Sequence, residues 1–352
     1  MKQEKPFLCF ISPLAGKNTE IIPTPADLLS ERFRQHGYPV LAVSAKKNKY
    51  FRLFEFCLSI IIYHKKIDLL ILSVYVGKSF FVEDLVSRWA QLFGIPIIMW
   101  LHNGLTPTFV SLFPNWSRKV FKRAKVIVAP SAYLPRALRP YGWQVQVIPN
   151  ITESEEYPYR HRSEISPSLF WMRSFYPYYN PDMALRVLNR LSVIYPHVSL
   201  VMAGKDKGLQ TDLINYAEVL GLTTNVKFPG FLNFQEKIQA FDKADIFIST
   251  NSVDNTPVSI VEAWAMGLPV VSTAVGGIAD LIEDGETGLL VPDDDDYAMA
   301  TAIRRLLENP ELVEKISRKG KEKAQKFSWF EVQRLWEEII SEAINGETRR
   351  SL

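Results

Sequence analysis

The sequence is poor in cysteine and has no long hydrophobic run. Its two cysteines, Cys9 and Cys57, lie in different expected elements and lack the spacing of metal ligands, which argues against a disulfide framework and against a zinc site. The most apolar stretch, residues 53–62, contains Glu55 and ends at a His-Lys-Lys run. Because a membrane-spanning helix needs roughly 20 apolar residues, we expect no such helix.

Three further signals are missing. Residues 1–13 hold only a short apolar run and no small-residue cleavage site, so we expect no signal peptide and place the chain in a reducing compartment, the cytoplasm. No G-x-G-x-x-G follows an expected strand, which argues against a dinucleotide-dependent dehydrogenase. We identify no metal-binding motif at the end of an expected strand, and we expect no metal and no cofactor.

The composition is that of a globular protein with two domains. The chain has 352 residues, of which 47% are hydrophobic and 22% are charged, and this length is well above the usual size of one domain. Residues 1–150 carry 20 Lys and Arg against 8 Asp and Glu, whereas the remainder carries 21 against 30. A basic first half indicates an anionic partner.

Apolar runs of strand length alternate with amphipathic runs of helix length, except in one polar stretch with two prolines. Near-continuous apolar strands separated by helices are typical of a parallel sheet covered on both faces. We therefore expect an α/β protein of two doubly wound, Rossmann-like domains facing a cleft, with ligands at the carboxyl ends of the strands. The expected divisions are residues 1–150, a linker over 151–167, residues 168–328 and a C-terminal helix over 329–352.

Two carboxylates stand close together after one expected strand. The strand ends at Thr250, a polar loop with Asp254 follows, and Thr256 is expected to cap a helix whose first residue is Pro257. The N-terminus of that helix offers N–H groups and partial positive charge to a phosphate. Glu262, little more than one turn inside, can accept two hydrogen bonds from a ribose, and Asp254 can bind the hydroxyls of a second ring.

After the next expected strand, Gly276 and Gly277 allow the backbone to approach a ligand closely. A phosphate between two hydroxyl-binding carboxylates describes a nucleotide-sugar. The alternative interpretation is structural, with Asp254 as a turn residue and Glu262 as a charge on a half-exposed helix.

The stretch from Asp254 to Asp295 resembles the signature of the family 4 retaining glycosyltransferases, which have the GT-B fold. The family pattern is E-x7-E, then a G-x-P-V-V strand, a G-G turn and a G-x-L-V tail. Asp254 stands in the first acidic position, and the rest of the pattern is matched by Glu262, Gly267, Pro269, Val270, Val271, Gly276, Gly277, Gly288, Leu290 and Val291. The match covers about 80 residues closely and the whole chain in outline.

The resemblance implies the GT-B fold, with the C-terminal helix crossing back to an acceptor-side first domain, and catalysis that does not depend on a metal. It implies Glu262 on the ribose and Asp254 on the donor sugar. The backbone near the phosphates is implied to include Asn255, Thr256, Pro257 and Val258.

Arg173, at the end of the first strand of the second domain, stands where the resemblance implies an arginine that neutralises the leaving diphosphate. A fork of guanidinium donors suits diphosphate oxygens, and the alternative is a strand-end arginine in solvent. The lysine that the family has shortly afterwards is missing, since Tyr179 and Asn180 stand there. Lys205 or Lys207, in the next strand-end loop, is expected to supply that charge.

His102, after the fourth strand of the first domain, matches a family histidine that faces the donor sugar, although a lone histidine is more often structural. Gly16, in the loop over residues 13–18, stands where the resemblance implies the acceptor and diphosphate loop. The expected catalytic residues are thus Arg173, His102 and Asp254. Since no carboxylate is placed as a nucleophile, the expected mechanism is leaving-group stabilisation with front-face attack.

Two basic stretches with interleaved aromatic residues, 46–56 and 115–125, account for much of the positive first half. Such segments can lie on an anionic membrane surface, and a solvated helix face is an equal alternative. No nucleic-acid-binding signature is present, so we expect no nucleic-acid partner.

Together these features predict a hexosyltransferase that moves a sugar, with retention, from a nucleotide diphosphate donor to a glycan or lipid-linked acceptor. The expected setting is cell-surface polysaccharide or glycoconjugate biosynthesis, in the cytoplasm or peripherally on the inner face of the membrane. Two alternatives stay open. One is a nucleotide-sugar epimerase or phosphorylase on the same fold, and the other is a non-catalytic, donor-binding partner of another transferase.

Overall fold

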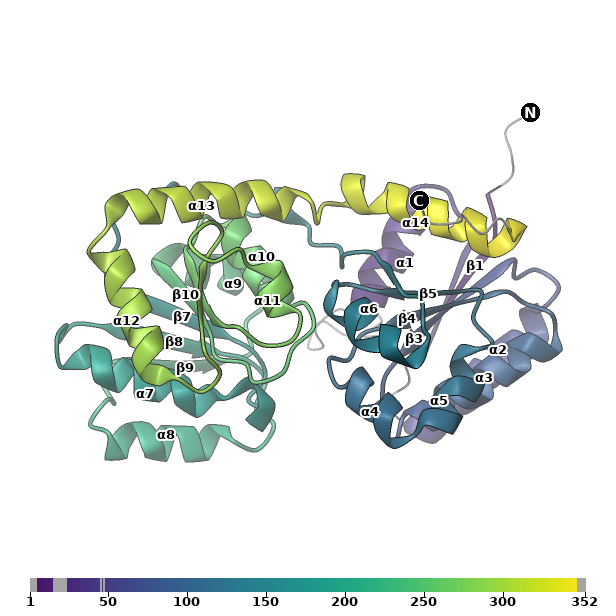
Figure 1. Cartoon of the computed structure of the whole chain (residues 1–352), viewed down its shortest axis with the longest axis horizontal. Helices are drawn as coiled ribbons and strands as arrows, with labels where there is room; N and C mark the ends of the chain where they lie inside the picture. The colour runs from purple at the N-terminus through teal and green to yellow at the C-terminus, as the bar shows by residue number, and fades with distance from the viewer. Residues whose placement is uncertain (1–4, 15–23, 45, 47, 347–352) are drawn as a thin grey trace. The chain divides into compact units, whose positions relative to one another are not determined.

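The computed structural model describes residues 5–14, 24–44, 46 and 48–346 (Figure 1). The chain divides into two compact units, the first made of Met1–Ile151 with Trp329–Leu352 and the second of Thr152–Ser328. In each unit, the described residues form a parallel sheet of six strands flanked by helices. The expected α/β architecture with two doubly wound sheets is therefore confirmed.

The sheet of the first unit has the strand order β2-β1-β3-β4-β5-β6, and all neighbouring pairs are parallel. Its strands are β1 (Leu8–Ile11), β2 (Val40–Val43), β3 (Leu69–Val74), β4 (Ile97–Leu101), β5 (Val126–Ala129) and β6 (Gln146–Val147). β1, β3, β4 and β5 are buried along their whole length. Burial on both faces explains why these strands are nearly continuous apolar runs in the sequence.

Two hydrophobic cores cover the two faces of this sheet. One lies beneath α2 (Lys49–Tyr63), α3 (Phe80–Leu92), α4 (Thr106–Leu112), α5 (Pro114–Phe121) and α6 (Tyr133–Leu138). The other lies beneath α1 (Pro25–Gln35) and the C-terminal helix α14 (Trp329–Asn345). Trp336 of α14 contacts Trp100 of β4, with ring centroids 5.1 Å apart. The expected return of the C-terminal helix to the first unit is confirmed.

The sheet of the second unit has the order β12-β11-β10-β7-β8-β9, again with parallel neighbours. Its strands are β7 (Ser168–Met172), β8 (Ser199–Ala203), β9 (Val226–Gly230), β10 (Ile246–Ser249), β11 (Val270–Thr273) and β12 (Leu289–Val291). β7 and β10 are central neighbours although β8 and β9 separate them in the sequence. The loops after β7 and β10 therefore leave the same edge of the sheet side by side.

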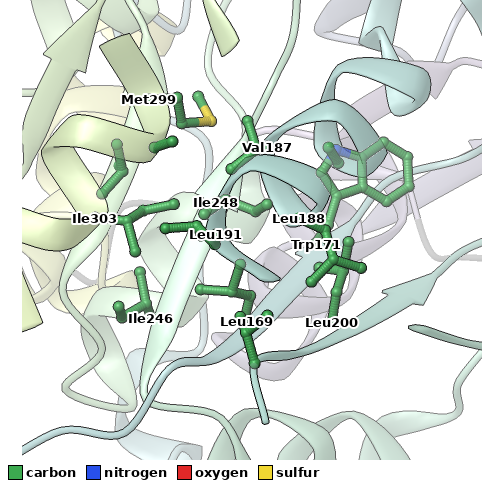
Figure 2. Close-up of a cluster of buried hydrophobic side chains, with 14 of the residues drawn as sticks. Leu169, Trp171, Val187, Leu188, Leu191, Leu200, Ile246, Ile248, Met299 and Ile303 are labelled. Atoms are coloured by element: carbon green, nitrogen blue, oxygen red, sulfur yellow. The ribbon is translucent and has the colours of Figure 1, made fainter. Parts of the chain in front are cut away.

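One core of this unit lies between the sheet and α7 (Pro181–Ser192), α8 (Gln210–Val219), α12 (Asp296–Leu307) and α13 (Pro310–Gln325). Figure 2 shows Leu169 and Ile246 of the sheet packed with Leu191 and Ile303 of the helices. The opposite core lies beneath α9 (Phe234–Lys243), α10 (Val258–Ala265) and α11 (Ile278–Leu281).

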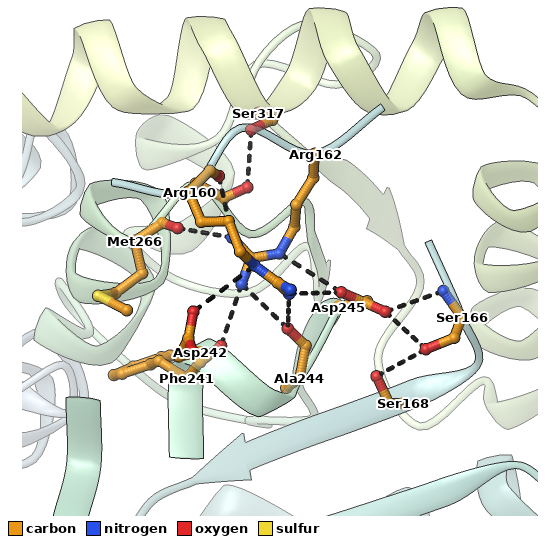
Figure 3. A network of polar contacts seen from close by, with 11 residues as sticks. Arg160, Arg162, Ser166, Ser168, Phe241, Asp242, Ala244, Asp245, Met266 and Ser317 are labelled. Atoms are coloured by element: carbon orange, nitrogen blue, oxygen red, sulfur yellow. Dashed lines mark hydrogen bonds and ion pairs between the residues drawn. The ribbon is translucent and has the colours of Figure 1, made fainter. Parts of the chain in front are cut away.

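The sequence predicts a linker over residues 151–167. All of these residues except Ile151 belong to the second unit, to which arginines fix them (Figure 3). Arg162 is almost fully buried. Its guanidinium donates, at 2.6–3.1 Å, to the carbonyl oxygens of Phe241, Ala244 and Met266. Arg160 forms an ion pair with Asp245 at 2.6 Å. These bonds anchor the segment from Tyr157 to Arg162 to the second unit.

Candidate functional site

The candidate site lies at the carboxyl edge of the second sheet. Arg173 directly follows β7, and Asp254 lies in the loop that follows β10. The backbone N–H of Arg173 donates to the carbonyl oxygen of Ala203 at 3.1 Å. Gly204 permits this close approach, because a Cβ there would lie 1.7 Å from the carbonyl oxygen of Arg173. The neighbouring strand end thus fixes the backbone of Arg173.

Arg173 and Asp254, which the sequence assigns to different parts of one ligand, form an ion pair with each other. Asn251 Nδ2 donates to the Asp254 carboxylate at 2.8 Å, and so does the backbone N–H of Asn255. Burial disfavours the charge of Arg173, yet the nearby carboxylates of Asp254 and Glu262 raise its pKa above the ordinary value. The guanidinium is therefore charged and is paired with Asp254. A strand-end arginine in solvent is excluded.

Several buried polar atoms at this edge have no hydrogen-bond partner within the described chain. They are Arg173 Nε, Ser249 Oγ, Asn251 Oδ1 and Thr256 Oγ1. Three of the four belong to the segment between the end of β10 and the start of α10. Since an unsatisfied buried polar group costs about 1–3 kcal/mol, their concentration on one segment is typical of a binding site.

α10 begins close to the expected position but without the expected cap. Pro257 occupies the N-cap position, and no side chain caps the helix. The predicted capping role of Thr256 is wrong, because extended Pro257 separates Thr256 from Val258, the first helical residue. The first N–H groups of an α-helix have no partner within the helix, so this end offers hydrogen-bond donors and partial positive charge.

Glu262 is buried on α10 and has two partners that the motif does not indicate. Tyr157 Oη donates to Glu262 Oε1 at 2.7 Å, and Lys237 Nζ donates to the same oxygen at 2.5 Å. Burial, together with the charge of Glu262, raises the pKa of Tyr157, which keeps the phenol protonated as a donor. The interpretation of Glu262 as a half-exposed helix charge is wrong. Its carboxylate is held in one orientation through Oε1.

No spacing in the sequence points to Tyr157 or Lys237. Tyr157 lies in an irregular segment 105 residues before Glu262, and Lys237 lies 25 residues before it. Lys237 is in the first turn of α9, where Asn233 and Glu236 exchange hydrogen bonds in a capping box. The available signal is the carboxylate within an apolar helix, which requires a partner when buried but does not identify it.

Gly276 permits a contact between two backbone segments. Its φ is +50°, and a Cβ there would lie 2.1 Å from the carbonyl oxygen of Asp254. The N–H of Gly277 donates to the same oxygen at 3.1 Å. This turn supports the backbone of Asp254.

A group of aromatic rings occupies the place of the missing family lysine. The rings lie 4.7–6.4 Å apart and belong to Tyr176, Tyr178 and Tyr179. The guanidinium of Arg173 lies 4.4 Å from the centre of the Tyr179 ring, which is a cation–π contact. Lys207 Nζ lies 5.9 Å from the centre of the Tyr176 ring, whereas Lys205 is exposed after β8. Of the two lysines, Lys207 is thus the one in contact with the tyrosines.

His102 lies in the first unit, after β4, beside other polar side chains. Its Nε2 is 3.2 Å from Ser73 Oγ, and its ring stacks on Tyr75 with centroids 5.3 Å apart. Burial lowers the pKa of His102 to about 3, so the imidazole is neutral at physiological pH and acts through hydrogen bonds. Gly16 lies outside the described residues.

Both carboxylates of the candidate site hold cationic side chains. Asp254 pairs with Arg173, and Glu262 pairs with Lys237. Over the described part of the chain, no three His, Cys, Asp or Glu side chains are grouped so that they could hold a metal ion. The chemistry available at the site is therefore that of oriented carboxylates, cations and a helix N-terminus.

Carboxylates, cations and a helix N-terminus at the carboxyl edge of a doubly wound sheet are the features expected of a glycosyltransferase. Residues 157–323 match the family model described as glycosyl transferases group 1. The matched residues include Tyr157, Arg173, Asp254 and Glu262. The match and the curated relatives confirm the expectation of a glycosyltransferase.

One curated relative is the phosphatidyl-myo-inositol mannosyltransferase of Mycobacterium leprae. It is 26% identical over an alignment of 273 residues, which covers 73% of this chain and 71% of the relative. The curated relatives that follow it are matched over 50% or less of their own length.

Solved structures have the same fold. Sucrose-phosphate synthase from Thermosynechococcus elongatus aligns with a TM-score of 0.79 at 17% identity, over 97% of this chain and 100% of that chain. Anabaena HepE in complex with UDP and glucose aligns with a TM-score of 0.74 at 20% identity, over 96% and 100% of the two chains. At such identities the likeness establishes the fold, and the expected GT-B fold is confirmed.

Proposed function

We propose that this chain is a retaining glycosyltransferase of the family 4 type, which transfers a hexose from a nucleoside diphosphate donor. The observation that carries the proposal is the Arg173–Asp254 ion pair beside the N-terminus of α10. A guanidinium and a helix N-terminus suit a diphosphate, and carboxylates suit sugar hydroxyls. The complex of HepE with UDP and glucose supports a uridine nucleotide as the donor.

In this proposal the donor diphosphate replaces Asp254 as the partner of Arg173. Arg173 then stabilises the negative charge that grows on the leaving diphosphate in an oxocarbenium-like transition state. The released Asp254 carboxylate accepts hydrogen bonds from hydroxyls of the donor sugar. The rest of the phosphate-binding segment is proposed to be Asn255, Thr256, Pro257 and Val258.

The nucleoside end of the donor is assigned to Glu262. Because Tyr157 and Lys237 both bond to Oε1, the other oxygen, Oε2, is proposed to accept the ribose hydroxyls. Lys205 and Gly16 are proposed as further donor-binding residues. His102, as a neutral imidazole, is proposed to hydrogen-bond to the donor sugar.

The acceptor is proposed to be a glycan or a lipid-linked glycan in the biosynthesis of cell-surface polysaccharide or glycoconjugates. The name of the Mycobacterium leprae relative, a phosphatidyl-myo-inositol mannosyltransferase, supports a lipid-linked acceptor. The excess of Lys and Arg over residues 1–150 supports an anionic partner. We place the protein in the cytoplasm or peripherally on the inner face of the membrane.

Thermal stability in a panel of nucleotide-sugars tests this function. A bound ligand at about 100 times its dissociation constant adds about 2.7 kcal/mol to the free energy of unfolding, so the true donor should raise the melting temperature clearly. Glu308→Gln, a change at the exposed C-cap residue of α12, is a control that should respond like the wild type. If no nucleotide-sugar and no nucleoside diphosphate raises the melting temperature, the assigned donor site is wrong.

Product analysis separates the transferase from its rivals. A transferase releases the nucleoside diphosphate and glycosylates an acceptor, an epimerase returns a nucleotide-sugar, and a phosphorylase requires phosphate. A non-catalytic partner binds the donor and leaves it intact. This last rival is favoured by Asp254 in place of glutamate and by the tyrosines in place of the family lysine, so intact donor after long incubation with acceptors would support it.

A further inference from the structure

A line of large hydrophobic side chains runs along the exposed face of α2. Tyr50 is 71% exposed, Phe51 68%, Phe54 65% and Ile62 59%, and Leu58 and Ile61 are exposed as well. With 3.6 residues per turn, these six positions fall within about one third of the circumference of the helix, whereas Phe56 and Ile60 fall on the other side and are buried. We call the six exposed residues the α2 surface. A contiguous apolar surface of this kind indicates an interaction site.

The neighbouring helices continue the same layer. α2 contacts α3, and α3 and α4 both contact α5, and Figure 1 shows these helices on the same side of the first sheet. Further exposed hydrophobic side chains of α3 and of the α4–α5 junction are Phe81, Leu92, Leu112 and Phe113. Apolar exposure is therefore a property of the layer and not of one side chain.

Exposed basic residues border the α2 surface at both ends. Lys46 precedes the helix, and Lys65 and Lys66 follow it. A surface hollow lined by Lys46, Phe51, Phe54 and Leu58, among others, combines an ammonium group with apolar side chains. On the neighbouring helix α5, Arg118 and Lys119 are exposed as well. A partner that fits must offer negative charge at its surface and apolar groups just beneath.

We propose that the α2 surface docks on an anionic lipid bilayer. An amphipathic helix with aromatic residues on one face and cations at its edges lies in the plane of the membrane interface, its apolar side at the boundary of headgroups and acyl chains. Among the helices of the described residues, none has the length and apolarity needed to cross a bilayer, so the contact is made by a helix lying on the membrane. A second copy of the chain fits less well, because a two-fold contact would oppose two positively charged surfaces.

This inference deepens the proposed function, because it says where the acceptor is located. A lipid-linked acceptor would reach the protein from the membrane on which α2 lies. It rests on the proposed function for the acceptor class only. The docking itself depends on the exposed side chains and charges of the first unit.

Flotation with vesicles tests the docking. The full chain is mixed with vesicles of phosphatidylcholine alone or of phosphatidylcholine with phosphatidylglycerol, at low and high salt. We expect flotation with the anionic vesicles and its loss at high salt, since each basic residue near such a surface contributes about 1 kcal/mol, or about fivefold in binding. Lys65→Ser with Lys66→Ser should therefore weaken binding by roughly 30-fold. The matched control is Lys227→Ser with Lys243→Ser, two exposed lysines of the second unit.

The apolar contribution is tested by Phe51→Ser with Phe54→Ser. Each lost ring should weaken vesicle binding by about tenfold or more, while the exposure of both side chains leaves the fold intact. Phe330→Ser on α14 removes a phenylalanine that is 82% exposed and lies outside this layer, so it should bind vesicles like the wild type.

Three results would overturn the docking proposal. The first is that the wild type does not float with anionic vesicles at low salt. The second is that the control variants lose as much vesicle binding as the test variants. The third is that the wild type is a dimer in light scattering and that Phe51→Ser with Phe54→Ser dissociates it, because the α2 surface would then be a contact between copies. Binding of UDP, measured by calorimetry on the same samples, keeps the two proposals apart. Failed flotation with intact UDP binding refutes the docking alone, whereas flotation without any nucleotide binding refutes the function alone.

Discussion

The candidate site contains two ion pairs made by half-buried cations and buried or nearly buried carboxylates, Arg173 with Asp254 and Lys237 with Glu262. Ion pairs of this kind add little net stability, because desolvation offsets attraction. They do fix the orientation of both partners. We infer that the pairs hold the side chains ready for a charged ligand, which then exchanges with Asp254 at the Arg173 guanidinium.

Arg173→Ala should lower turnover about 10²–10³-fold, the usual effect of losing one preorganised donor at a developing charge. Donor binding should change much less, because the charge on the leaving diphosphate grows toward the transition state. Steady-state measurement of kcat and KM checks this, with Arg304→Ala, at an exposed side chain of α12, as the control. Wild-type kcat with only a raised KM would instead assign Arg173 to ground-state binding.

Lys237→Met should weaken UDP binding by roughly tenfold or more, because it leaves the buried Glu262 carboxylate without its cation. The kcat at saturating donor should stay near the wild-type value, since the ribose is bound equally in the ground state and in the transition state. Lys237→Arg should restore most of the affinity. A lower melting temperature with unchanged UDP affinity in calorimetry would show that Lys237 is merely structural.

Which residues reach the site was partly predictable from the sequence. Arg173 and Asp254 were predictable because each follows a strand whose carboxyl end lies at the same sheet edge. Their mutual ion pair was not, because it depends on the placement of β7 next to β10. Tyr157 and Lys237 were not predictable either, since both come from segments with no motif and are brought to Glu262 by tertiary packing.

At the scale of elements, the segment before β7 shows how packing overrides composition. Residues 151–167 are polar and irregular in sequence, which favours a linker. In the folded chain the segment is held by Arg162, whose buried guanidinium donates to the ends of α9 and α10 (Figure 3). This anchoring keeps Tyr157 in contact with Glu262.

Arg162→Met should lower the free energy of unfolding of the second unit by at least about 3 kcal/mol, because several buried carbonyl oxygens lose their donor. Arg160→Met, at a side chain that is 43% exposed, should cost much less. Urea denaturation followed by fluorescence measures both. Equal, small effects of the two changes would contradict the anchoring role of Arg162.

The start of α10 differs by one residue from the position that the preference of proline for the first helical position predicts. Proline is favoured in the first helical position, which predicts Thr256 as the cap. Pro257 instead adopts an extended conformation with ψ of 113° and takes the N-cap position itself. The predicted start is thus wrong by one residue, and the predicted direction of the helix N-terminus, at the carboxyl edge of the sheet, is unaffected.

On α3, Glu83 predicts a pH dependence of stability. It is buried, its Oε1 accepts from the backbone N–H of Tyr75 at 3.1 Å, and its Oε2 has no partner among the described residues. Burial raises the pKa of Glu83 from 4.5 to about 8. Because the folded pKa lies above the unfolded one, the carboxyl contributes stability below about pH 4.5 that is lost as the pH rises toward 8.

Glu83→Gln keeps the shape and removes the titration. It should match the wild type near pH 4.5 and be more stable than the wild type at pH 9, where each unit of pKa shift corresponds to about 1.4 kcal/mol. Urea unfolding at the two pH values provides the comparison. If the variant and the wild type differ in the free energy of unfolding by the same amount at both pH values, the raised pKa of Glu83 is contradicted.

At the scale of the whole molecule, two units of one architecture carry opposite charge. The first unit has 23 basic and 13 acidic residues, and the second has 18 and 25. The sequence predicted the two α/β units, because strands buried on both faces are continuous apolar runs. It also predicted the return of the C-terminal helix through the family resemblance. It indicated a surface position for residues 46–56, and the structure shows in addition that the exposed hydrophobic side chains of α2 continue to Leu58, Ile61 and Ile62.

The central claim is that the carboxyl edge of the second sheet binds a nucleotide-sugar, with Glu262 on the ribose. Isothermal titration calorimetry of UDP with the wild type and with Glu262→Gln tests it most directly, with Glu308→Gln as a matched control. The account predicts that the wild type and the control bind UDP alike and that Glu262→Gln binds it more weakly by about 1.5–3 kcal/mol, or roughly 10- to 150-fold. Equal UDP affinity in all three proteins, or no UDP binding by the wild type, would contradict it.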